Sequence, residues 1–245
     1  MLDISYFEKL FNGTFKVLNG LPRYIALEQV QPEPDFKEKL GHLIGVGKSN
    51  KLQYISVLIQ KTNNDYSNIL ITNGFEHRSS IIEYTKDLGN IEELPCEFQW
   101  KSLENELTEK EFKDTWRQCM LYSDNKPSTF TMAQHLEAVK SELGNNWRNS
   151  CRVFLKGGKP IGVTIPHMEP GTTDEGRLFY FGLIPEMRGK GLSSSLHKQS
   201  LQFLREMGAT YYIGSTQATN KKMQHVFIRS GCMLKSHMES FYKYF

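Results

Sequence analysis

The stretch Leu183-Ile-Pro-Glu-Met-Arg-Gly-Lys-Gly-Leu-Ser-Ser-Ser-Leu196 joins an apolar, aromatic run to a segment with helical periodicity. The run before the proline predicts a strand, and the segment after the second glycine predicts a helix. Gly189 and Gly191 lack a Cβ, so an anion can approach the unpaired backbone N–H groups at the helix N-terminus. Arg188 and Lys190 add positive charge. This arrangement predicts a phosphate-binding loop.

Known kinds of phosphate loop differ in the spacing of their glycines. The G-x-x-x-x-G-K-[ST] spacing of a P-loop is absent, and Ser194 stands where a dinucleotide-binding G-x-G-x-x-G needs its third glycine. Arg188-Gly-Lys-Gly-Leu-Ser193 instead resembles the R/Q-x-x-G-x-G/A loop with which the GNAT N-acetyltransferase superfamily binds acyl-CoA. Ser193 departs from the family's glycine or alanine, but serine is also small. The alternative interpretation is a basic turn between a strand and a helix.

The segments after the loop support the resemblance. Apolar and small residues recur at helical spacing up to Met207, and Gly208 then predicts the helix end. Residues 209–216 are β-branched and aromatic, which predicts a strand. Residues 220–231, led by Asn220, resemble the family's N-x-x-A-x-x-L-Y-x-x-x-G-F helix, and residues 235–245 predict a closing strand.

The segments before the loop complete the order. Residues 152–165 predict a hairpin turning at two glycines, residues 108–121 and 132–143 predict helices, and residues 97–101 predict a first strand. Thr108 and Glu111 have the spacing of a capping box. The order β-α-α-β-β-β-loop-α-β-α-β is that of the GNAT family, so we expect an α/β (α+β) GNAT fold with a mixed central sheet flanked by helices. The alternative is an unrelated α/β domain with the same order by chance.

Composition limits the class of protein. The chain has 245 residues and a net charge of +3, which is too mild and too evenly spread to indicate a nucleic-acid partner. No apolar run approaches the roughly 18 residues of a membrane span, and the N-terminus lacks a signal pattern. The four cysteines, Cys96, Cys119, Cys151 and Cys232, show no metal-binding spacing. We expect no metal and a cytoplasmic protein with reduced thiols, either monomer or homodimer.

The first part of the chain resembles the last. Residues 54–60 and 63–86 predict a strand, a helix, a glycine and a strand. The aligned pairs are Asn63 with Asn220, Ile71 with Ile228, Gly74 with Gly231, Ser79 with Ser236 and Lys86 with Lys243. Chance similarity is the alternative. We interpret residues 1–95 as a degenerate GNAT-like domain and residues 96–245 as the acetyl-CoA-binding catalytic domain.

The degenerate half lacks the phosphate loop. Residues 23–28 match the strand before the loop, but Pro32-Glu-Pro-Asp35 stands in the loop's place. That segment is acidic and contains two prolines, which lack backbone N–H groups, so it would not hold a diphosphate. We therefore expect one CoA per chain.

The resemblance implies a role for each part of the cofactor site. Pantetheine would lie as an extra strand between residues 178–184 and 211–216, and a backbone N–H near Leu183 would meet the developing oxyanion. Asn220 would contact the pantetheine arm, and a plain helix N-cap is an equally good interpretation of this residue. The expected cofactor contacts are Leu183, Ile184, Arg188, Gly189, Lys190, Gly191, Leu192, Ser193, Ser194 and Asn220.

The acid and base of an acyl transfer are less well marked. The tyrosine that the family uses as general acid falls on Phe227, which has no proton to give, and water, Ser215 or Thr216 are possible substitutes. For the base we consider His167 and Glu169, acting through water, although a solvated hairpin turn is the alternative for both. We expect His225 at the surface.

The sequence therefore predicts an N-acetyltransferase that uses acetyl-CoA and a primary amine of a small molecule or peptide. Phe227 keeps open a non-catalytic acyl-CoA-binding protein, and transfer of a longer acyl group is a third possibility. Tyr180 and Phe181 should point to opposite faces of the sheet, because side chains alternate along a strand.

Overall fold

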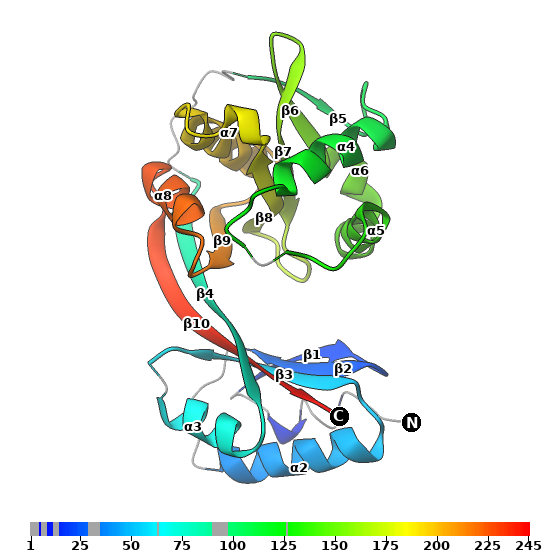
Figure 1. The fold of residues 1–245 in the computed structure, drawn as a ribbon, viewed down its shortest axis with the longest axis vertical. Coiled ribbons are helices and arrows are strands. Elements are labelled where there is room, and N and C mark those ends of the chain that lie inside the picture. Colours follow the sequence, from blue (N-terminus) through cyan, green and yellow to red (C-terminus); the bar gives the residue numbers. More distant parts are fainter. Residues whose placement is uncertain are drawn as a thin grey trace. The chain divides into compact units, whose positions relative to one another are not determined.

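A computed structural model describes residues 5, 9–11, 15–28, 35–62, 64–89, 98–125 and 127–245. The chain forms two compact units, Met1–Ile82 with Ser236–Phe245, and Glu83–Lys235 (Figure 1). The sequence placed a single division at residue 95. The structure divides instead inside strands β4 (Glu76–Asp87) and β10 (Met233–Tyr244), because each of these strands contributes residues to both units.

The unit Glu83–Lys235 contains a mixed sheet flanked by helices, as predicted. Its strands are hydrogen-bonded in the order β9-β8-β7-β6-β5, with β8 and β9 parallel and the others antiparallel. The elements are β5 (Gln99–Ser102), α4 (Glu109–Met120), α5 (Met132–Leu143), η1 (Gly144–Asn146), α6 (Trp147–Ser150), β6 (Arg152–Lys156), β7 (Lys159–Met168), β8 (Glu175–Leu183), η2 (Pro185–Met187), α7 (Leu192–Glu206), β9 (Tyr211–Gln217) and α8 (Lys221–Arg229).

Two local features of this unit, a helix cap and a hairpin turn, confirm predictions made from the sequence. Thr108 and Glu111 form the predicted capping box at the start of α4. The β6–β7 hairpin turns at Gly157 and Gly158, which both have positive φ values of 56° and 74°. The predicted first strand begins at Gln99, and Glu97 lies outside the described residues.

Apolar clusters lie on the two faces of this sheet. Helices α4 and α5 pack through Phe112, Trp116 and Val139 against strand residues that include Val163. Helix α7 packs through Leu196 and Phe203 in a second cluster with β6 and β8 residues. The two clusters hold the helices on either side of β8, the strand that precedes the predicted phosphate loop.

The other unit also combines parallel and antiparallel strands, and it has its own apolar core. Its strands are ordered β1-β2-β3-β10, with β2 and β3 parallel. Its elements are β1 (Lys16–Gly20), β2 (Tyr24–Glu28), α2 (Phe36–Ser49), β3 (Tyr54–Gln60), α3 (Asn64–Thr72) and parts of β4 and β10. Leu40, Leu43 and Leu70 of the helices pack on Ile55 and Val57 of β3. The predicted break at residues 32–34 lies outside the described residues.

The two aligned blocks end their helices alike. Helix α3 ends before Gly74 and helix α8 before Gly231, with φ values of 78° and 79°. In one unit, Lys243 Nζ donates to Asn73 O over 2.8 Å. In the other, Lys86 Nζ donates to Ser230 O over 2.5 Å.

The alignment that pairs Gly74 with Gly231 also pairs Lys86 with Lys243. Each lysine therefore binds the end of the helix from the other aligned block, since Lys86 lies in β4 and Lys243 in β10. A cation at a helix C-terminus is favourable because the last carbonyl groups carry partial negative charge. Asn63, the partner of Asn220 in the alignment, lies outside the described residues.

Candidate functional site

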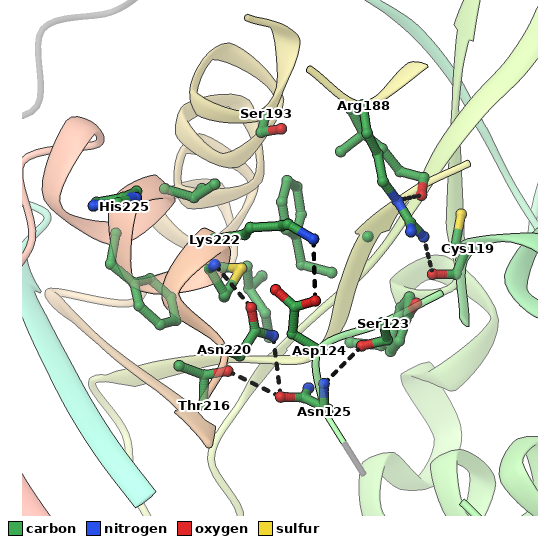
Figure 2. A pocket seen from close by; sticks show the side chains of 18 of the residues that line it. Cys119, Ser123, Asp124, Asn125, Arg188, Ser193, Thr216, Asn220, Lys222 and His225 are labelled. Carbon is green, nitrogen blue, oxygen red and sulfur yellow. Dashed lines mark hydrogen bonds and ion pairs between the residues drawn. The ribbon is translucent and has the colours of Figure 1, made fainter. Parts of the chain in front are cut away.

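Strands β8 and β9 part from each other along most of their length. Within the described residues they pair at Glu175 with Tyr211 and at Gly176 with Tyr212. Beyond these pairs, residues 178–183 of one strand and Ser215 and Thr216 of the other line a cavity of about 720 Å³ (Figure 2). The predicted gap between residues 178–184 and 211–216 is present.

Backbone donors of β8 point into this gap. The N–H of Ile184 donates to Ile161 O on the β7 side, over 3.1 Å. Because N–H groups alternate between the two edges of a strand, the N–H of Leu183 points away from β7, toward the cavity. The register also shifts at Ile165 and Pro166, so Phe179 is an extra residue on β8. The strand therefore offers an unpaired edge to a ligand.

The phosphate loop leads from β8 into α7. Gly189 and Gly191 have φ values of 72° and 77°, in the left-handed region that favours glycine. A Cβ on either would meet no atom of the described residues within 4 Å, so the space beside the loop is open. Gly191 is the N-cap of α7, and no described side chain caps this helix start. Both glycines line the cavity together with Ser193 and Ser194.

The remaining loop residues expected to bind the cofactor have other surroundings. Ile184 packs against the core cluster of α4 and α5, and Leu192 packs against the cluster of α7. Lys190 is exposed. None of these three is among the described residues that line the cavity, so contact with the cofactor remains a prediction for them.

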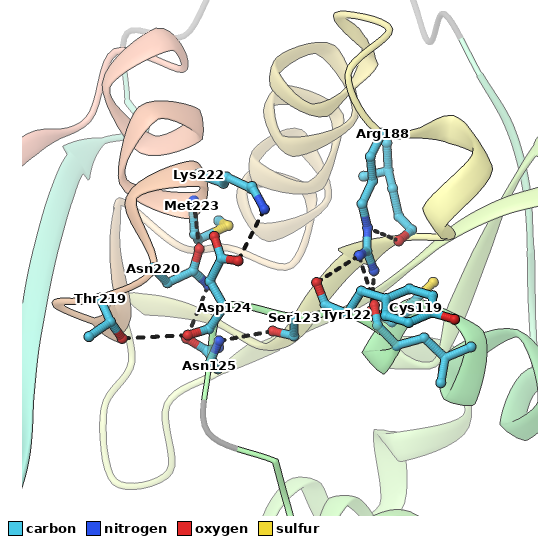
Figure 3. A network of polar contacts seen from close by, with 12 residues as sticks. Cys119, Tyr122, Ser123, Asp124, Asn125, Arg188, Thr219, Asn220, Lys222 and Met223 are labelled. Atoms are coloured by element: carbon cyan, nitrogen blue, oxygen red, sulfur yellow. Dashed lines mark hydrogen bonds and ion pairs between the residues drawn. The ribbon is translucent and has the colours of Figure 1, made fainter.

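Arg188 caps the end of helix α4 and also lines the cavity, so contact with the cofactor stays a prediction for it (Figure 3). Its Nε donates to Leu183 O over 3.0 Å, and its Nη atoms donate to Cys119 O over 2.9 Å and to Leu121 O over 2.7 Å. A further contact reaches Tyr122 O over 3.2 Å. The last carbonyl groups of a helix lack intrahelical partners, so the guanidinium satisfies them.

Asn220 is the N-cap of α8, as one interpretation of the sequence had it. Its Oδ1 accepts from the N–H of Met223 over 3.0 Å. Its Nδ2 donates to Asn125 Oδ1 over 3.0 Å, and Thr216 Oγ1 donates to the same oxygen over 3.4 Å. Asn220 lines the cavity, so the predicted contact with pantetheine and the capping role are compatible.

The segment after α4 forms a wall of the cavity that the sequence did not indicate. Ser123, Asp124 and Asn125 all line it. Asp124 pairs with Lys222 Nζ over 3.0 Å, as Figures 2 and 3 show. Together with Arg188, these contacts join the end of α4 to both sides of the gap. Such contacts between distant residues leave no periodic signal in a sequence.

His167 and Glu169, the candidate bases, lie outside the described lining of the cavity. The His167 ring is 5% exposed, and its Nε2 lies 3.6 Å from Glu142 Oε1 and 3.7 Å from Glu169 Oε2. Glu169 pairs with Arg177 over 3.1 Å. His167 is buried, so the solvated-turn interpretation is wrong for this residue. Burial lowers the pKa of His167 to about 4, so it is neutral near pH 7.

The buried neutral histidine predicts a pH dependence of stability. The unfolded chain binds a proton at His167 below its ordinary pKa of 6.5, whereas the folded chain does so only near 4. The contribution of His167 to stability is therefore fully present above pH 6.5, and it is lost as the pH falls toward 4. Between pH 7.5 and pH 5, the free energy of unfolding of His167→Gln should fall by about 2 kcal/mol less than that of the wild type. Urea unfolding at the two pH values measures this difference. The exposed His225 is the control: wild-type and His225→Gln curves should run parallel. Parallel curves for His167→Gln would contradict the prediction.

Aromatic side chains cover the rest of the cavity. Tyr180 packs with the α4 cluster and Phe181 with the α7 cluster, so the predicted alternation is confirmed, and both line the cavity. Burial raises the pKa of Tyr180. Phe227 and Tyr212 line the side nearest α7 and α8. His225 is exposed, as predicted, and also lines the cavity.

Comparison with known proteins identifies the family. A family model described as "Acetyltransferase (GNAT) family" matches residues 100–231. The chain belongs to the GNAT acetyltransferase family. The matched range contains the parted strands, the glycine loop and the helix led by Asn220, so the family features are those that build the cavity.

Solved GNAT structures share the fold at low identity. A GCN5-related N-acetyltransferase from Sphaerobacter thermophilus is 14% identical, with a TM-score of 0.65, over 94% of this chain and 76% of that one. A GNAT-family acetyltransferase from Colwellia psychrerythraea is 14% identical, with a TM-score of 0.57, over 95% and 81%. A tandem GNAT protein from the clavulanic acid biosynthesis pathway is 11% identical, with a TM-score of 0.59, over 94% and 78%. No curated protein matches the sequence.

In the part of the chain that the structure describes, no helix combines the length and apolar character needed to cross a membrane. The same residues include no group of three or more His, Cys, Asp or Glu that could hold a metal ion.

Proposed function

We propose that this GNAT protein transfers an acetyl group from acetyl-CoA to a primary amine of a small molecule or peptide. The observation that carries the proposal is the parting of β8 and β9 beside a helix N-terminus that follows two left-handed glycines. Acetyl-CoA would supply the acetyl group, activated as a thioester. The gap has room for an extended arm, and the loop has room for a diphosphate.

Each part of the site has a distinct task in this proposal. The N–H groups of the loop and of the first turn of α7 bind phosphate oxygens. The unpaired edge of β8 binds the pantetheine amides as a neighbouring strand would. The N–H of Leu183 stabilises negative charge on the carbonyl oxygen as the amine adds. His167 and Glu169 remain proposed bases, and their distance from the cavity lining requires proton transfer through water.

The degenerate N-terminal half is also a proposal. Two observations support a repeat. The helices end alike at Gly74 and Gly231, and each of the two aligned lysines binds the helix end of the other block. One of the similar solved structures is named a tandem GNAT protein. We propose that this half binds no CoA. The buried free thiols of Cys119, Cys151 and Cys232 support a reducing, cytoplasmic location.

Calorimetric titration and a thiol-release assay test the function. We expect one acetyl-CoA bound per chain and release of CoA thiol with at least one amine from a panel of n-butylamine, spermidine, glucosamine and glycinamide. Two acetyl-CoA molecules per chain would contradict the degenerate half. Failure to bind acetyl-CoA would contradict the function itself.

Phe227 favours a second candidate, a protein that binds acyl-CoA without turnover. Phe227 lines the cavity at the position where the family resemblance places a tyrosine. Tight CoA binding without thiol release on any amine would support this candidate. Turnover of succinyl-CoA or a longer acyl-CoA, but not acetyl-CoA, would instead identify a transferase of a different acyl group.

A further inference from the structure

Tyr212 stands where the gap between β8 and β9 begins. It forms the last pair with Gly176 before the strands part, and it lines the cavity although its side chain is 1% exposed. Its ring packs at 5.5 Å from the ring of His197, which lies on α7 and is fully buried. Phe181 and Phe227 complete the surroundings of His197, at 5.2 and 5.4 Å.

The Tyr212 hydroxyl is hydrogen-bonded to this histidine. His197 Nε2 lies 3.3 Å from Tyr212 Oη, and His197 Nδ1 is buried without a partner among the described residues. We assign the His197 proton to Nε2, because a buried N–H without an acceptor is costlier than a bare acceptor nitrogen. His197 therefore donates to the phenol oxygen, and the phenol keeps its own O–H free to donate into the cavity.

Gly214 leaves room for the Tyr212 hydroxyl. A Cβ built on Gly214 would collide with Tyr212 Oη and would lie 2.7 Å from Phe227 Cε1. The hydroxyl thus lies over the glycine, beside the edge of the Phe227 ring. A side chain at position 214 would displace one of the two rings.

Other proton donors on this side of the cavity are less suited. Phe227 has none, and Thr216 Oγ1 already donates to Asn125 Oδ1. Ser215 is exposed on β9. A departing thiolate needs a donor that faces the cavity and is held in place.

We infer that Tyr212, held by His197, is the general acid that protonates the sulfur of the departing CoA in the proposed acetyl transfer. This role rests on the proposed function. Two observations support the assignment. The Tyr212 phenol lies in the cavity wall with the His197 imidazole behind it, and Phe227 has no proton to give.

The transfer balances within the site. The amine nitrogen forms a bond to the carbonyl carbon, the carbon–sulfur bond breaks, and its electron pair goes to sulfur. Burial raises the pKa of Tyr212, so the phenolate that forms when Tyr212 gives its proton to sulfur needs the His197 Nε2–H as a donor. The proposed base, His167 or Glu169, takes the proton from the amine nitrogen through water, and the phenolate regains that proton through water. The net change moves one proton from nitrogen to sulfur. His197 stays neutral throughout, because burial lowers its pKa to about 3.

A binding measurement tests the contact without turnover. Wild-type protein should bind CoA about fivefold more tightly than desulfo-CoA by calorimetry, and Tyr212→Phe should bind the two equally. Tyr211→Phe is the matched control, because its hydroxyl donates to Glu175 Oε2 over 2.9 Å and does not line the described cavity. The control should keep the preference for CoA. Equal preference in wild type and Tyr212→Phe would overturn the assignment.

Kinetics with two donors test the role in transfer. With the best amine of the panel, Tyr212→Phe should lower kcat for acetyl-CoA about 100-fold. It should lower the rate with S-phenyl thioacetate much less, because thiophenolate leaves without a proton. Tyr212→Phe/Phe227→Tyr should recover part of the acetyl-CoA rate. If the wild type turns over and Tyr212→Phe has the same rate, only the assignment of Tyr212 is overturned. If the wild type does not turn over, the transferase function is overturned as well.

Discussion

Gly191→Val is expected to weaken acetyl-CoA binding by at least about 100-fold, or roughly 2.7 kcal/mol. Gly191 is the N-cap of α7 at a φ of 77°, and the space beside its Cα is open. A valine side chain would fill the space that the diphosphate needs, and it would hold the phosphate oxygens away from the N–H groups of the first turn. Titration calorimetry with acetyl-CoA measures the effect, and Gly189→Val should behave alike.

The variant also strains the backbone, so its control must carry the same strain. Gly171 has a φ of 83°, no described atom within 4 Å of a Cβ built on it, and a place outside the described cavity lining. Gly171→Val should therefore lose similar stability, about 1–2 kcal/mol, and keep its affinity for acetyl-CoA. Unchanged affinity in Gly191→Val, or an equal loss in Gly171→Val, would contradict the loop assignment.

Arg188→Met is expected to lower the free energy of unfolding by about 2 kcal/mol and the affinity for acetyl-CoA by about tenfold. The guanidinium caps α4 and binds Leu183 O, so its loss leaves several carbonyl groups without a partner. Tyr122, at a left-handed φ of 54°, would also lose a contact that holds it. Urea unfolding and calorimetry measure the two effects.

Two variants separate capping from charge. Arg117→Met also removes a positive charge from the last turn of α4, but that side chain is 59% exposed and pairs with Asp114. We expect a loss below about 0.5 kcal/mol for this control. Arg188→Lys keeps the charge but presents a single donor group, so it should restore only part of the stability. Equal losses in Arg117→Met and Arg188→Met would show that charge alone explains the effect.

Much of this fold could be predicted from local sequence signals. The capping box at Thr108, the glycine turn after β6 and the N-cap at Asn220 each depend on residues within a few positions of one another. The glycine loop likewise depends on two φ values that glycine favours. The gap between β8 and β9 was predictable in another way, because the order of strands and the loop together resemble the GNAT family.

The parts that could not be predicted depend on contacts between distant residues. The guanidinium of Arg188 binds carbonyl groups of a helix end more than sixty positions earlier, and the pattern R-x-x-G-x-G/A gave no sign of this second role. The wall formed by Asp124 and Asn125 depends on α8 in the same way. His197 looks like one more residue of an amphipathic helix, and only its place behind Tyr212 suggests a role.

A crystal structure with acetyl-CoA bound would show where the cofactor lies. We expect one molecule per chain, with its diphosphate on the N–H groups of residues 189–194 and its pantetheine between β8 and β9. Its sulfur should lie within hydrogen-bond reach of Tyr212 Oη. A diphosphate bound elsewhere, or a gap left empty beside a bound cofactor, would contradict the assignment of this cavity to acetyl-CoA.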